Sequence, residues 1–318
     1  MEVRKLQLIG GSSYMLSLPK EWVRSNGLKQ GDELYLKVEN SVVTIYPKKF
    51  FEVSRITGVK VDGLPRHDEK FLRRYLYAIY IQGVDEIEIR DENINARIVS
   101  RIGEIVKDLI GMEIIDASEN YVRLKCLAAT DFDVYSVVRR MTQIVRSMLS
   151  TLLEATNNPE VLEDVETLER DADRLYLLAV RQEHRLIREY SSPTKWNELR
   201  LILGIRTVAK LLEEIADSLY DFSVYAKKTD VKSLGKSIEE ISGAFDTVCD
   251  AYFGSDVGVA EDAIERLEKI EEMCLADMGG DVFYRLALEA IVRASRHMKS
   301  IAEIAFNKAV RESLQRSG

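Results

Sequence analysis

Apolar residues recur at helical spacing in the longer, second part of the chain, from Thr130 to residue 315. Thr130 is a typical N-cap, and Pro159 and Pro193 stand at helix starts, where the missing N–H of proline is tolerated. The pattern predicts six helices at about residues 130–156, 159–190, 193–227, 231–253, 257–278 and 281–315. Long helices joined by short connections predict antiparallel bundles. We expect an all-α part, residues 128–318, made of two three-helix halves.

Strand-like alternation dominates the first 49 residues, which we call the head. The pattern predicts strands at residues 3–8, 13–18, 33–38 and 42–46, with one helix at 20–26. Gly27 follows that helix where a left-handed C-cap is expected, and Gly31 stands in a turn that requires positive φ. About fifty residues bury too little apolar surface to fold alone, so the head is expected to oligomerise.

Residues 50–127 predict a small α/β domain between these two parts. Strands are expected at 53–61 and 86–89, helices at 65–82 and 96–110, and a hairpin at 113–116 with 121–126. One face of the first helix is expected to carry Phe71, Tyr75, Ala78 and Ile79. The second helix is expected to point Ile98, Ile102, Ile105, Val106 and Leu109 inward. No nucleophile, phosphate loop or metal site has its usual spacing here, so we predict a spacer or dimerisation domain.

The head resembles the SpoVT/AbrB-like swapped-hairpin module. Three runs carry this resemblance: Gly11–Ser13, Ser17–Trp22 and Gly27–Glu33. The resemblance implies a DNA-binding domain that exists only as an intertwined dimer.

Charge is distributed unevenly along the chain. The head has eight Lys/Arg against five Asp/Glu, a balance of +3, so a net charge of −8 for the whole chain leaves −11 for the rest. Four basic residues on the first predicted strand and helix are our candidates for DNA binding: Arg4, Lys5, Lys20 and Arg24. Lysine and arginine neutralise phosphates, and an arginine can read a guanine edge. The alternative is that these are ordinary solvated charges.

The helical part resembles PhoU-type phosphate-signalling proteins over residues 130–315. The runs Glu169–Leu175 and Val180–Gln182 match the family's first motif helix, and Glu198–Arg200 with Leu212–Asp217 match the second. The sequence departs from the family pattern at three positions. Glu198 stands where an aspartate is usual, Glu214 where an arginine is usual, and Ala216 where a glycine is usual. Proteins that join these two modules resemble archaeal phosphate-uptake regulators.

Two pairs of acids with a spacing of four residues lie on the motif helices: Glu169 with Asp173, and Glu213 with Asp217. Residues four apart share one helix face, so facing helices would bring four carboxylates together. Such a group attracts cations or protons, and oxygen-only ligands favour magnesium, calcium or manganese. The PhoU resemblance adds iron and zinc. The alternative is salt bridging to nearby cations: Arg170, Arg174, Arg206 and Lys210.

The second half of the helical part predicts no equivalent metal site. Alignment of its motif region places Val292 and Arg296 where the acids would stand. The partner helix keeps three glutamates, Glu265, Glu268 and Glu272, which Arg293 and Arg296 are placed to neutralise.

Other features narrow the class of protein. No apolar stretch approaches the roughly eighteen residues of a membrane span, and no signal peptide is recognised. The three dispersed cysteines have no metal spacing and indicate reduced thiols in the cytoplasm: Cys126, Cys249 and Cys274. We expect a non-enzymatic, homodimeric DNA-binding regulator of phosphate uptake. The alternatives are an adaptor for a phosphate transporter or signalling partner, with a head used mainly for dimerisation, and an antitoxin-like protein.

Overall fold

The computed structural model describes residues 2–39, 42–48, 58–127, 134–189, 196–277 and 279–316. The chain forms two compact units, one consisting essentially of Met1–Ile56 and the other of nearly all the remaining chain. The expected N-cap Thr130, the helix start at Pro193 and the strand residues 53–57 lie outside the described residues.

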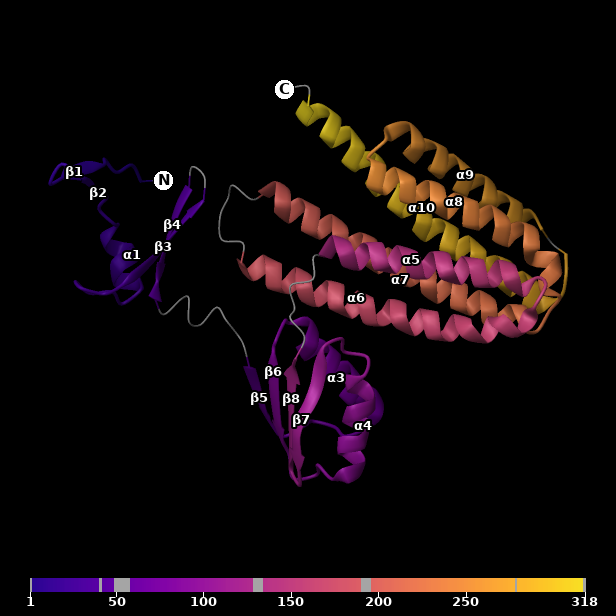
Figure 1. The fold of residues 1–318 in the computed structure, drawn as a ribbon, viewed down its shortest axis with the longest axis horizontal. Helices are drawn as coiled ribbons and strands as arrows, with labels where there is room; N and C mark the ends of the chain where they lie inside the picture. The colour runs from indigo at the N-terminus through magenta and orange to yellow at the C-terminus, as the bar shows by residue number, and fades with distance from the viewer. Residues whose placement is uncertain are drawn as a thin grey trace. The chain divides into compact units, whose positions relative to one another are not determined.

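The described residues of the first unit form two separate antiparallel hairpins and helix α1 (Figure 1). Strands β1 (Gln7–Ile9) and β2 (Ser13–Met15) form one hairpin, and β3 (Leu34–Glu39) and β4 (Val42–Pro47) form the other. Helix α1 spans Lys20–Ser25. The first hairpin is shorter than predicted because its ladder has only three residue pairs around a turn at Gly10 and Gly11, both with positive φ. Among the described head residues, Pro47 alone is buried.

The α/β domain has a four-stranded sheet in the order β5-β6-β8-β7. Its elements are β5 (Gly58–Asp62), α3 (Glu69–Ile81), β6 (Glu86–Arg90), α4 (Ala96–Val106), β7 (Met112–Ser118) and β8 (Tyr121–Cys126). Strands β5 and β6 are parallel, and β8 runs antiparallel to both of its neighbours. Helices α3 and α4 cover the same face of the sheet (Figure 1). Side chains of Asp68 and Asn95 cap their amino ends.

The inward residues predicted for α4 are confirmed, whereas the apolar face predicted for α3 is only partly buried. All five expected core residues of the region from Ala96 to Ile110 are buried. Helix α3 instead buries Leu72, Leu76 and Tyr80. The helix carries two adjacent apolar rows, and the row that includes Phe71 and Tyr75 lies on its flank, where these two rings stack with centroids 5.5 Å apart.

In the described part of the bundle, six long helices are present, as predicted, and they lie alongside one another (Figure 1). They are α5 (Val134–Ala155), α6 (Asp164–Glu189), α7 (Trp196–Ala226), α8 (Gly235–Gly254), α9 (Val257–Ala276) and α10 (Val282–Arg316), with short 3-10 helices η1 (Pro159–Glu163) and η3 (Val231–Leu234). Helix α10 packs against α7, α8 and α9, and α5 packs against α6, α7 and α8. One continuous apolar core therefore joins both three-helix halves, separate from the core of the α/β domain. None of the helices in the described part of the chain is suited to cross a bilayer.

Candidate functional site

Helices α6 and α7 position the predicted acids because their apolar residues fix which faces point inward. On α6, Val165 and Ala172 are buried in the bundle core. On α7, Ile215 and Ala216 are buried in the same way. The predicted acids stand close to these buried positions in the sequence, so they flank the buried stripes where α6 and α7 pack together.

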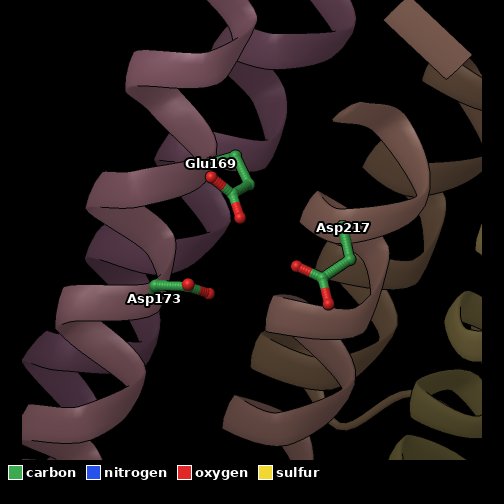
Figure 2. A group of neighbouring side chains, drawn as sticks. All are labelled: Glu169, Asp173 and Asp217. Carbon is green, nitrogen blue, oxygen red and sulfur yellow. The ribbon is translucent and has the colours of Figure 1, made fainter. Parts of the chain in front are cut away.

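Three of the four predicted carboxylates converge (Figure 2). One carboxylate oxygen from each of Glu169, Asp173 and Asp217 lies within 4.8 Å of the other two. We call these three residues the carboxylate site. Glu213 belongs instead to a neighbouring group with Glu214, and this group also includes Asp217.

The cations near these acids mostly have other partners. Arg170 pairs with Glu166 at 3.6 Å, Arg174 with Asp171 at 3.2 Å, and Arg206 with Glu183 at 3.0 Å. Lys210 forms ion pairs with Glu213 and, at 2.8 Å, with Glu214. Within the described residues, no ion pair or hydrogen bond involves the side chains of the carboxylate site. The salt-bridge alternative therefore describes Glu213 but not Glu169, Asp173 or Asp217.

Burial and mutual repulsion disfavour ionisation of the acids. Burial first, and then the charges of Glu169 and Asp217, raise the pKa of Asp173 to about 7. Burial also raises the pKa of Glu213 to about 7, although Lys210 opposes that shift. The pKa values of Glu169 and Asp217 are raised by burial first and then by neighbouring acids. Any cation placed among the three carboxylates would relieve this repulsion.

The donor set suits a hard cation. Three carboxylates from two facing helices provide oxygen ligands of the kind that magnesium, calcium and manganese prefer. Glu169, Asp173 and Asp217 are the residues that would hold such an ion. Water molecules would complete its coordination, because these metals take six or more ligands.

The predicted DNA-binding residues form two pairs. Arg4 and Lys5 precede β1, whereas Lys20 and Arg24 lie four residues apart on α1. All four residues are exposed. Arg4 also forms an ion pair with Glu2, so it is partly neutralised within the chain.

Two family models match the chain. The model described as "Antidote-toxin recognition MazE, bacterial antitoxin" matches residues 7–52, and the PhoU domain model matches residues 138–225. The chain is a fusion of these two domains. Comparisons with curated proteins and with solved structures gave no match. Both matched families are regulatory rather than enzymatic.

The PhoU match covers the carboxylate site and ends near the end of α7, so the second three-helix half lies outside it. The MazE-type match includes Lys20 and Arg24 but begins after Arg4 and Lys5.

In the second half, cations of α10 pair with two glutamates of α9. Val292 is buried, Arg296 pairs with Glu271, and Lys299 pairs with Glu268 at 2.5 Å. Among the described residues, neither arginine pairs with the expected glutamates Glu265, Glu268 and Glu272, because Arg296 pairs with Glu271 and Arg293 pairs with Asp221 of α7 at 2.6 Å. No group of metal-ligating side chains is found among the described residues of this half.

Sequence reasoning missed two features around the PhoU domain. The first is Glu214, which joins the acidic surface next to the carboxylate site and shares Lys210, already a candidate partner of the acids, with Glu213. The spacing of Lys210, three and four residues before these acids, is the signal that could have indicated the pairing. The second feature is the buried Arg181, which joins α6 to the α/β domain.

Proposed function

We propose that this protein is a homodimeric DNA-binding regulator of phosphate uptake or phosphate signalling, with the PhoU domain as its sensor or relay. The observation that carries the proposal is the fusion of a MazE-type head to a PhoU domain in one chain. A PhoU domain supports phosphate-related regulation, and a MazE-type domain supports DNA binding or an antitoxin-like role.

The exposed apolar residues of the head support dimerisation. Neither apolar core of the chain includes a described head residue. Leu8 is 58% exposed, Tyr14 73% and Leu36 65%, although all three lie on strands. Large apolar side chains on strands favour burial, at about 25 cal/mol for each Å² removed from water. A second head would supply the covering surface that one chain lacks.

The carboxylate site supports a sensor or relay role for the PhoU domain. Three acids without a cationic partner among the described residues favour binding of a divalent cation at Glu169, Asp173 and Asp217. A ligand changes the conformation of a protein only if it binds one state more tightly than another. In the proposed mechanism, cation binding at this site changes the relative positions of the two PhoU domains of the dimer. This change in turn alters the affinity of the paired heads for DNA.

A retardation assay with the DNA upstream of the protein's own gene, at two salt concentrations, tests the proposal. We expect the triple variant Arg4→Gln, Lys5→Gln, Arg24→Gln to bind more weakly. Each lost phosphate contact should reduce the salt slope by about one. A control variant removes three exposed charges from the bundle: Arg140→Gln, Lys232→Gln and Lys236→Gln.

Equal affinities and slopes for wild type and the triple variant would refute DNA reading by these residues. A dimer that binds no DNA at either salt concentration would favour the adaptor function, with the head acting as a dimerisation module.

A further inference from the structure

One row of residues on α6 connects the carboxylate site to the α/β domain. Glu169, Asp173, Leu177, Arg181 and Arg185 follow one another at intervals of four residues, so they form a ridge along the helix. The first two belong to the carboxylate site. The other three contact the α/β domain, because Leu177 packs against its core and both arginines bond to it.

Arg181 is the centre of this contact. Its side chain is 0% exposed, and its guanidinium group donates to the carbonyl oxygens of Tyr80 at 2.9 Å and Val84 at 2.8 Å. It also donates to the Asp85 carboxylate at 2.6 Å and lies 4.8 Å from the centroid of the Tyr80 ring. A planar guanidinium with fixed donors makes these bonds only in a narrow range of orientations. A small movement of α6 would therefore weaken the contact.

The α/β domain also acts on the other end of the ridge. Asp108, just after α4, pairs with Arg73 and accepts a hydrogen bond from the Tyr77 hydroxyl at 2.7 Å. Its negative charge contributes to the raised pKa of Asp173. The domain thus places a negative charge near the carboxylate site, in addition to its contact with Arg181.

Helix α6 is also tied to α7 along this stretch. The buried Glu183 accepts from Arg206 of α7 at 3.0 Å, and Arg206 donates to the Tyr176 hydroxyl at 3.3 Å. Asp173 and Arg181 are eight residues apart, which is about 12 Å along a helix. Over that length a packed helix moves as a stiff body, so a shift at one end changes the contacts at the other.

We propose that the α/β domain is a regulatory unit of the carboxylate site, such that cation binding at the site and docking of the domain on Arg181 strengthen each other. That a cation occupies the site rests on the proposed function. The mechanical coupling between the site and the α/β domain rests only on the row of residues along α6. Docking holds Glu169 and Asp173 in place against Asp217, so the site is preorganised. Binding reciprocally holds α6 in the orientation that Arg181 requires.

The experiment uses the full chain and measures two quantities. The first is the Mn²⁺ dissociation constant by calorimetry, for wild type, Arg181→Lys and Asp85→Asn. The second is hydrogen exchange in residues 79–86, at the end of α3, with and without Mn²⁺. Arg181→Lys keeps the positive charge but loses the planar guanidinium group with its several donors. Asp85→Asn leaves Arg181 itself unchanged. If one variant fails to fold, the other still tests the contact. Arg140→Lys, on the exposed face of α5, is the matched control.

We expect Mn²⁺ to slow hydrogen exchange in residues 79–86 of the wild type at least fivefold. Arg181→Lys and Asp85→Asn should each raise the Mn²⁺ dissociation constant by a similar factor. The control should behave as wild type. If the wild type binds Mn²⁺ and neither quantity changes, the coupling is refuted while the proposed site stands.

A metal-free comparison separates the two proposals. Asp173→Asn removes the central charge of the site, and Asp262→Asn on the exposed face of α9 is its control. If the wild type binds no Mn²⁺, the cation role fails. The coupling then stands if Asp173→Asn alters exchange in residues 79–86, and it is overturned if exchange is the same as in Asp262→Asn.

Discussion

Replacing Asp173 with asparagine is expected to stabilise the metal-free protein above neutral pH. Asparagine has nearly the same shape as aspartate but never ionises, so it removes the repulsion from Glu169 and Asp217 without leaving a cavity. Burial and neighbouring acids raise the pKa of Asp173 to about 7. Above that pH the wild type therefore carries a negative charge that its surroundings disfavour.

The magnitude follows from the pKa of the folded and unfolded states. A carboxyl group whose pKa rises from 3.8 to about 7 on folding loses roughly 4 kcal/mol of stability when fully ionised, at 1.36 kcal/mol for each tenfold change. Asp173 is partly exposed, and solvent screening reduces this to about 1–2 kcal/mol. The folded state binds the proton more tightly, so the free energy of unfolding falls as the pH rises from about 4 to about 7.

Urea denaturation followed by far-UV circular dichroism, which reports mainly on the bundle, measures this difference. At about pH 8 the Asp173→Asn variant should be more stable than the wild type by about 1–2 kcal/mol, and near pH 4 the two should converge. Asp262→Asn should follow the wild type at both pH values. A gain that is independent of pH, or no gain at pH 8, would refute the electrostatic account of the site.

A divalent cation should make the wild type more stable than the Asp173→Asn variant, the reverse of the order expected without metal. Mn²⁺ at about 100 times its dissociation constant would stabilise the folded wild type by about 2.7 kcal/mol through mass action. The Asp173→Asn and Asp217→Asn variants, each lacking one anionic ligand, should lose this gain. Equal Mn²⁺-dependent shifts in wild type and both variants would place any bound ion elsewhere.

Three further predictions concern other parts of the chain. The protein should be a dimer by light scattering at micromolar concentration, and Leu36→Asp should convert it to monomers by placing a charge on the exposed apolar surface of the head. Arg296→Gln should leave stability nearly unchanged, because the exposed guanidinium of Arg296 keeps its ion pair with Glu271 in contact with solvent, and the thermal shift with Mn²⁺ should be unchanged. Arg181→Met should lower the free energy of unfolding by about 1–3 kcal/mol, because buried carbonyls at the end of α3 lose their donor; urea denaturation measures this loss.

The sequence predicted the structure best where the apolar residues of a helix form a single stripe, because only one face can then be buried. The long helices of the bundle have one apolar stripe each, so their existence and approximate bounds could be predicted. Helix α3 has two adjacent apolar rows, and periodicity cannot select between Leu72–Leu76–Tyr80 and the row of Phe71 and Tyr75. The sheet makes that choice, because strands far along the chain form the surface on which the helix packs.

The site shows the same limit. Spacing predicted which acids share a helix face, and Glu169, Asp173 and Asp217 do converge. Spacing placed Lys210 within reach of Glu213 and Glu214, but it could not decide which of the nearby acids the lysine would pair with. It also gave no sign that Arg181 contacts Asp85, since the two residues lie 96 positions apart in the chain.

The contrast between the two halves of the bundle favours a functional role for the carboxylate site. In the second half, acids on α9 face cations on α10, as in Glu271 with Arg296 and Glu268 with Lys299. In the first half, arginines at comparable distances in sequence pair with other acids, and neighbouring acids of the site raise the pKa values of Glu169 and Asp173. A bundle selected for stability alone would have neutralised both surfaces, because stabilising charge substitutions are readily available to a sequence. Unfavourable local choices that persist are expected where a site has to bind something, and a cation is the ligand that would relieve the unfavourable charge between α6 and α7.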